Sequence, residues 1–181
     1  MKTGPLSALL GAAVAFATVV AVPPMSETSA QAAAPSNDFA KRLLRAHNQE
    51  RARVGAKPLQ WDAQLAADAK QWADHLAKRG RMEHATYEQR KKAGENLWMG
   101  SAGYYSAETM IGGFIDEKKD FRPGKFPDLS RTGRWQDVAH YTQLIWHDTR
   151  QIGCAVSRDA VNDFLVCRYF PVGNWIGQQI G

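Results

Sequence analysis

The residues best suited to chemistry are imidazole- and carboxylate-bearing side chains, and one of them opens a compact apolar run. The run extends from Ala139 to Trp146. On helical spacing His140 shares a face with Leu144, so its imidazole lies at the edge of a core-facing surface and needs polar partners. Imidazoles and carboxylates ligate cations and transfer protons, so the functional question is whether other such groups converge on His140. The sequence offers three candidates: His84, Glu95 and Glu117.

Two amphipathic helices are predicted in the first half of the chain. Asn37 or Asp38 can cap a helix that runs from about residue 39 to residue 54 and ends at Gly55. Asp62 can cap a second helix that ends at Gly80. Apolar side chains at helical spacing predict that this second helix packs by one face: Leu65, Ala69, Trp72 and Leu76.

Two further histidines fall on these helices, and neither is predicted to act in chemistry. His47 lies on the apolar side of the first helix, where a lone histidine is usually a hydrogen-bonded core residue rather than a ligand. His75 lies beside the apolar stripe of the second helix and is expected to be half exposed. We therefore predict a structural role for His47.

The elements around the other candidates are shorter. A glycine-bounded piece from Leu97 predicts a short strand, and Ser106 can cap a third helix. Glu117 shares the face of Met110 and Phe114 on that helix. Burying a carboxylate without partners costs several kcal/mol, so we predict that Glu117 is paired or hydrogen-bonded.

The segment from residue 121 to residue 134 contains prolines, glycines and charges without periodicity, and it predicts a loop that leads into the His140 helix. Loops beside a site often control access to it. We therefore expect its aromatic and basic side chains to border a cavity, with a solvated loop of no particular role as the alternative. These side chains are Phe121, Arg122, Lys125, Phe126 and Arg131.

Residues 151–157 and 164–170 predict a β-hairpin near the end of the chain. One register places Cys154 opposite Cys167 and Ile152 opposite Tyr169 on the same face. Directly opposed residues of antiparallel strands lie close enough for a disulfide. We therefore predict a disulfide between Cys154 and Cys167.

The N-terminal segment has the layout of a secretory signal peptide, in which Lys2 precedes the apolar run Leu6 to Val22 and small residues follow at Ala30-Gln31-Ala32. We assign residues 1–32 to a signal peptide and processing region. A retained membrane anchor is the alternative, but the run is at the short limit of a spanning helix and only moderately hydrophobic. The prediction is a secreted protein, extracellular or, in a Gram-negative bacterium, periplasmic, where the disulfide can form.

Length and charge indicate one compact domain over residues 33–181. The chain has 181 residues and is 44% hydrophobic, which suits a single core and leaves no room for a second domain. Its formal charge is +5, yet the basic residues are interleaved with acidic ones. This pattern favours a solvated surface over a nucleic-acid-binding face, and we predict a monomer without a nucleic-acid partner.

Short motifs follow one another along the chain in a characteristic order. They are His47-Asn48, Gly94-Glu95-Asn96-Leu97, His140 to Trp146, Gly153-Cys154-Ala155, and Cys167-Arg168-Tyr169 with Pro171, Gly173 and Asn174. In this order they resemble the CAP superfamily, the family of cysteine-rich secretory proteins, antigen 5 and pathogenesis-related 1 proteins, also called SCP domains. The resemblance covers about residues 38–176, and the ordered set is specific where any single motif would be weak.

The resemblance implies an α+β fold, a three-layer α-β-α sandwich with a small antiparallel sheet between helical layers. It also implies a central cavity lined by two histidines and two glutamates, which by motif position are His84, Glu95, Glu117 and His140. The chain departs from the family pattern at three positions around this cavity: Phe114, Ala139 and His147. With two cysteines it lacks the extra disulfides of many animal relatives, so channel-blocking roles are not implied.

In such a cavity the neutral imidazoles of His84 and His140 can ligate Zn²⁺ or another divalent cation, while the glutamates serve as ligands or orient the imidazoles. Two histidines alone make a weak, exchangeable site. We therefore predict cation binding without committed catalysis. The resemblance adds an expected contact with a sterol, another lipid or a membrane surface.

A metal-assisted, peptidase-like hydrolase is the alternative function, because a metal lowers the pKa of bound water and a glutamate can accept its proton. The chain lacks the His-Glu-x-x-His helix and the Gly-x-Ser-x-Gly turn that mark committed hydrolases. A third interpretation is a His/Glu network that satisfies its own hydrogen bonds and has a structural role only.

Overall fold

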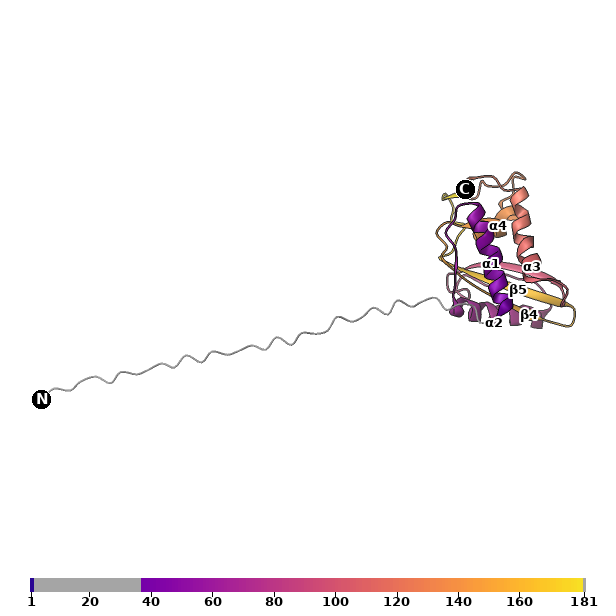
Figure 1. The fold of residues 1–181 in the computed structure, drawn as a ribbon, viewed down its shortest axis with the longest axis horizontal. Helices are drawn as coiled ribbons and strands as arrows, with labels where there is room; N and C mark the ends of the chain where they lie inside the picture. The colour runs from indigo at the N-terminus through magenta and orange to yellow at the C-terminus, as the bar shows by residue number, and fades with distance from the viewer. Residues whose placement is uncertain (2–36, 181) are drawn as a thin grey trace. The chain divides into compact units, whose positions relative to one another are not determined.

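The computed structural model of the chain describes residue 1 and residues 37–180 (Figure 1). The predicted signal peptide, apart from Met1, lies outside the described residues. Residues 37–180 form three layers, in which helix α2 covers one face of a four-stranded sheet and helices α1, α3 and α4 cover the other. This arrangement confirms the predicted α-β-α sandwich.

The two long helices begin and end where local sequence signals predict. Helix α1 (Asp38–Arg53) starts after Asn37, whose side chain accepts a hydrogen bond from a backbone N–H of the first turn at 2.7 Å. Helix α2 (Ala63–Arg79) starts after Asp62 in the same way. Gly80 ends α2 in the left-handed conformation, with φ of 64°, which an L side chain rarely adopts.

The other helical elements are short and lie around the predicted site. They are α3 (Ala107–Ile115), the 3₁₀ turn η1 (Asp116–Lys119), the 3₁₀ turn η2 (Trp135–Val138) and α4 (Ala139–Ile145). Ser106 caps α3 as predicted, through a hydrogen bond from the backbone N–H of Thr109. Glu117, which we expected on the face of this helix, lies instead on the tighter turn that follows it.

The main sheet has the strand order β1-β4-β5-β2. Its strands are β1 (Gln60–Trp61), β2 (Gly94–Ser101), β4 (Gln151–Arg158) and β5 (Asn162–Phe170). The three long strands pair antiparallel with one another, whereas β1 is parallel to β4. The sheet is therefore mixed rather than wholly antiparallel, because β1 leads into helix α2 and no hairpin forces it to run against β4.

The predicted hairpin register is confirmed. Cys154 lies opposite Cys167, and the two form a disulfide with their Cα atoms 4.1 Å apart. Ile152 lies opposite Tyr169 on the same face. Strand β2 differs from the prediction because it begins at Gly94 rather than at residue 97.

The loop predicted between residues 121 and 134 contains a short strand. Strand β3 (Gly124–Lys125) pairs with β6 (Gln179–Ile180), and Phe121 makes a single antiparallel bridge to Ser130. Strand pairing with the C-terminal end of the described chain therefore holds the segment that leads into α4 in place. No helix of the described residues combines the length and the apolar character that crossing a membrane requires.

The packing of α2 on the sheet depends on one glycine. A Cβ atom added to Gly153 would lie 2.1 Å from the backbone nitrogen of Ala66 in α2. The missing side chain therefore allows the helix to approach strand β4. Around this contact, the α2 face of the sheet buries an apolar cluster: Ala69, Ala73, Leu76, Leu97, Phe164 and Val166.

Candidate functional site

The two predicted histidines line one cavity of about 410 Å³. His84 comes from the segment between α2 and β2, and His140 from the first turn of α4. Further polar side chains of the cavity wall are Arg90, Glu95, Asn96, Gln143 and Asn174. The apolar part of the wall is Phe126, Trp135, Ala139, Val172 and Ile176.

His140 is held by Glu117. The Nδ1 atom of His140 lies 2.5 Å from Oε1 of Glu117, and Oε2 accepts from the backbone N–H groups of His140 and Tyr141 at 3.0 Å each. One carboxylate thus caps the first turn of α4 and fixes the imidazole. Because a carboxylate only accepts, Nδ1 carries the hydrogen and Nε2 is left without a proton in the neutral ring. The ring of Phe114 stacks on this imidazole, with centroids 5.1 Å apart.

His84 is held in the same manner by Glu95. Its Nδ1 lies 2.6 Å from Oε1 of Glu95, which also accepts from the backbone N–H of Ala85 at 3.1 Å. The glutamate side chain is 0% exposed, whereas the histidine side chain is 59% exposed at the cavity mouth. The contact with Glu95 uses Nδ1 alone, so Nε2 of His84 takes no part in it, as in His140.

The buried carboxylate of Glu95 has a cationic partner that sequence analysis did not identify. Arg168 lies directly opposite it on strand β5, and Nη1 of Arg168 is 2.5 Å from Oε2 of Glu95. Burial lowers the pKa of Arg168, and the charge of Glu95 opposes that effect. The ion pair offsets the cost of burying both charges in the sheet.

The structure brings the four predicted residues together as two pairs rather than as one ligand cluster. His84, Glu95 and His140 line the cavity, and Glu117 lies behind His140 with its side chain 19% exposed. Among the described residues, no group of three or more His, Cys, Asp or Glu side chains is placed to hold a metal ion. Each glutamate contacts Nδ1 of its histidine, so Nε2 of both imidazoles lies outside the two pairs.

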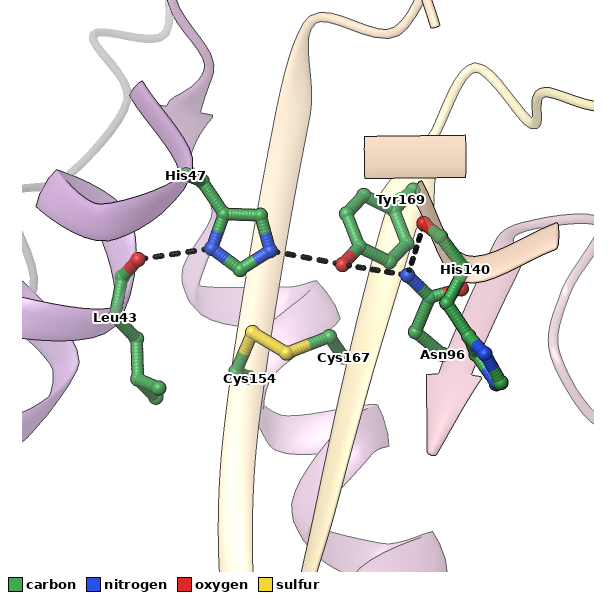
Figure 2. Close-up of a disulfide and its surroundings, with 7 residues drawn as sticks. All are labelled: Leu43, His47, Asn96, His140, Cys154, Cys167 and Tyr169. Atoms are coloured by element: carbon green, nitrogen blue, oxygen red, sulfur yellow. Dashed lines mark hydrogen bonds between the residues drawn. A yellow bond between two sulfur atoms is a disulfide. The ribbon is translucent and has the colours of Figure 1, made fainter. Parts of the chain in front are cut away.

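A buried chain of hydrogen bonds fixes the backbone behind the site (Figure 2). Nδ1 of His47 donates to the carbonyl of Leu43 at 2.8 Å, so Nε2 accepts from the hydroxyl of Tyr169 at 2.8 Å. Asn96 donates to that hydroxyl at 3.2 Å and to the carbonyl of His140 at 3.0 Å. Burial lowers the pKa of His47 to about 4, which keeps the ring neutral. The predicted structural role of His47 is confirmed.

Arg51 holds the other end of α4. Its buried guanidinium donates to the carbonyls of Leu144 at 2.8 Å, Trp146 at 3.0 Å and Thr149 at 3.1 Å. Leu144 lies in the last turn of α4, Trp146 follows the helix directly, and Thr149 lies just beyond it. Burial lowers the pKa of Arg51 to about 10, so it stays charged at neutral pH. Glu117 and Arg51 together fix the short helix that carries His140.

Other wall residues were predicted only in part. Of the five loop side chains expected to border the cavity, Phe126 lines it, and the other four are not among its lining residues. Arg90 and Trp135 were not predicted, because they lie in segments without periodicity. Of the departures from the family pattern, Ala139 lines the cavity and Phe114 packs on His140, while His147 is exposed and is not part of the wall.

Comparison with known proteins gives consistent matches. The model of a family described as "CAP: Cysteine-rich secretory protein family" matches residues 44–169. Pathogenesis-related protein 1A of Nicotiana tabacum is 35% identical over 137 residues, which cover 75% of this chain and 77% of that protein. Pathogenesis-related leaf protein 6 of Solanum lycopersicum is 34% identical over 139 residues, which cover 75% of this chain and 79% of that protein.

A solved structure agrees with these matches. The crystal structure of NaASP2 with Zn²⁺ superposes with a TM-score of 0.67 at 25% identity, over 81% of this chain and 88% of that one.

Proposed function

Because the chain belongs to the cysteine-rich secretory protein (CAP) family, we propose that it is an exported protein whose His84/His140 cavity binds a divalent cation, with Zn²⁺ as the first candidate. One observation carries this proposal. Each imidazole of the cavity wall has its Nδ1 atom bound to a glutamate, which leaves both Nε2 atoms as available ligands.

The donor set fits a weak, open cation site. Histidine ligands of metals commonly donate their second ring N–H to a carboxylate, which fixes the tautomer and makes the ligating nitrogen more basic. Two imidazoles leave the remaining coordination positions to water or another ligand, so the ion should exchange readily. Zinc is the natural test ion because neutral imidazole suits it and because a similar protein, NaASP2, has a structure with Zn²⁺.

The contacts of the two glutamates favour binding over the alternative of hydrolysis. Oε1 of Glu95 accepts from His84 and from the N–H of Ala85, while its Oε2 is in ion-pair contact with Arg168 and the side chain is 0% exposed. The two oxygens of Glu117 accept from His140 and from two backbone N–H groups. A general base needs an oxygen within reach of the proton that it removes. Neither carboxylate is free for that role in this arrangement.

Calorimetric titration with zinc at neutral pH tests the proposal. We expect one site per chain in the wild type and nearly complete loss of binding in His84→Ala and in His140→Ala. Glu117→Gln keeps an oxygen acceptor but removes the charge, so its affinity should fall by about ten- to a hundredfold. His75→Ala is the matched control, because His75 is bonded to Glu83 and does not line the cavity.

Equal zinc affinity in the wild type and both alanine variants would place the ion elsewhere and leave the four residues as a structural network. Thermal unfolding of each variant serves as the control for folding, since Glu117 also caps α4. The sterol or lipid contact implied by the family resemblance stays a prediction, as does the monomeric state.

A further inference from the structure

Arg90 is a cation of the cavity wall, and no acidic side chain of residues 37–180 forms an ion pair with it. Its Nε atom is buried and has no hydrogen-bond partner among the described residues. The contact that its guanidinium does make is with the ring of Tyr87, 5.8 Å from the centroid. Arg90 lines the cavity, so its charge faces a space in which no carboxylate of the described residues forms an ion pair with it.

The acidic side chains near Arg90 are already paired. Glu95 is the carboxylate of the cavity wall, and its oxygens are occupied by His84 and Arg168. Lys91, the next residue along the chain, differs from Arg90 because it pairs with Asp68 at 2.8 Å. The positive charge of Arg90 is therefore available to a ligand in the cavity.

The cavity wall also contains apolar side chains. Phe126 is buried and packs edge-on against Trp135, with ring centroids 5.4 Å apart. Trp135 is 40% exposed and Ile176 is 83% exposed, so both present apolar surface at the mouth of the cavity. A ligand that fills this space would bury apolar area as well as satisfy a charge.

We propose that the His84/His140 cavity takes an organic carboxylate with an apolar body. The carboxylate binds the guanidinium of Arg90, which matches its planar, two-oxygen geometry, and the apolar body packs on Trp135 and Ile176. This inference rests on the proposed function, because it assigns a second ligand to the same cavity. The cavity of about 410 Å³ lies within the range of small-molecule sites.

The test uses 4-phenylbutyrate as the probe and its uncharged amide, 4-phenylbutyramide, as the matched control. Binding is measured by calorimetry on the wild type, once with a chelator and once with zinc. We expect the acid to bind in both conditions, and Arg90→Gln to weaken it about tenfold or more, as the loss of a charge-assisted hydrogen bond predicts. Lys92→Gln removes a neighbouring exposed charge that does not line the cavity, and it should leave the affinity unchanged.

The amide should bind weakly, with the same affinity in the wild type and in Arg90→Gln. Trp135→Ala should weaken binding of the acid through its apolar body, while inorganic phosphate should compete poorly. Equal affinity of the acid in the wild type and Arg90→Gln would overturn the proposal. It would also be overturned if phosphate competed as well as the acid and Trp135→Ala had no effect, since the site would then accept any anion.

Zinc titration of Arg90→Gln separates this proposal from the cation site. We expect that variant to bind zinc as the wild type does, because Arg90 supplies no metal ligand. If zinc bound but binding of the acid did not depend on Arg90, the carboxylate proposal would be contradicted and the cation proposal would stand. If the acid bound through Arg90 in the presence of the chelator and zinc bound in no condition, the carboxylate proposal would be supported and the cation proposal contradicted.

Discussion

His47 shows at the scale of one residue how burial determines a charge state. Its ring is completely buried, donates to one backbone carbonyl and accepts from Tyr169. Protonation would place a second donor against that hydroxyl and a charge in the core. Burial of the ring lowers the pKa of His47 to about 4, and the charge of Arg51 acts in the same direction, whereas an unfolded histidine has a pKa of about 6.5.

The free energy of unfolding should therefore depend on pH through His47. The unfolded chain takes up this proton at a higher pH than the folded chain, so the contribution is fully present above about pH 6.5. It declines by about 1.4 kcal/mol per pH unit as the pH falls toward 4. Urea unfolding of the wild type and of His47→Gln at pH 7.5 and pH 5.0, with a chelator present, measures this contribution to the free energy of unfolding. The wild type should be the more stable at pH 7.5, and the difference should shrink by about 2 kcal/mol at pH 5.0.

Other titrating groups contribute equally to both proteins and cancel in this comparison. A stability difference that is the same at both pH values would show that His47 does not carry the effect.

At this scale, sequence analysis succeeded where a residue lies in a periodic segment. His140 lies on the short helix that its spacing predicts, and Glu117 is hydrogen-bonded as predicted, although it lies on the 3₁₀ turn after α3 rather than on the helix face. Arg90 and Arg168 were missed. Arg90 lies in a segment without periodicity, and the partner of Arg168 is Glu95 on a different strand, 73 positions earlier in the chain. Only strand pairing brings those two charges together.

At the scale of elements, the contact between α2 and the sheet is set by Gly153. A methyl group there would meet the backbone of α2, which cannot move aside as a flexible side chain could. We expect Gly153→Ala to lower the free energy of unfolding by about 1–3 kcal/mol, the usual cost of overpacking a core. Chemical denaturation measures the change.

Gly112 provides the matched control for this substitution. It lies within helix α3, and a Cβ atom added there would find no other atom within 4 Å. Gly112→Ala should therefore raise the free energy of unfolding by about 0.5–1 kcal/mol, because alanine favours a helix over glycine. If both substitutions changed stability in the same direction, the close approach at Gly153 would not be the cause.

Most elements could be predicted because their ends depend on neighbouring residues. Asn37, Asp62 and Ser106 each accept from a backbone N–H three residues later, and Gly80 permits the backbone that ends α2. The parallel strand β1 and the early start of β2 could not be predicted in this way. Both depend on pairing with strands that lie much later in the chain.

At the scale of the whole molecule, the cavity forms where separate layers meet. Helix α4 brings His140, strand β2 brings Glu95, and the segment between α2 and β2 brings His84. The series of hydrogen bonds that links His47, Tyr169 and Asn96 holds these parts together, and the buried guanidinium of Arg51 does so as well. The apolar wall comes from later loops, so the shape of the cavity depends on the complete fold.

The central claim is that the two glutamates leave Nε2 of His84 and His140 free to bind a cation. Long-range ¹⁵N–¹H correlation of the imidazole nitrogens, before and after one equivalent of zinc, tests it most directly. The sequence has five histidines, so the spectrum is simple enough to assign. We predict that both rings carry hydrogen on Nδ1 before zinc is added, and that zinc shifts the Nε2 signals of these two residues and of no other histidine. Hydrogen on Nε2 in either ring, or zinc-induced shifts at His75 or His147 instead, would contradict it.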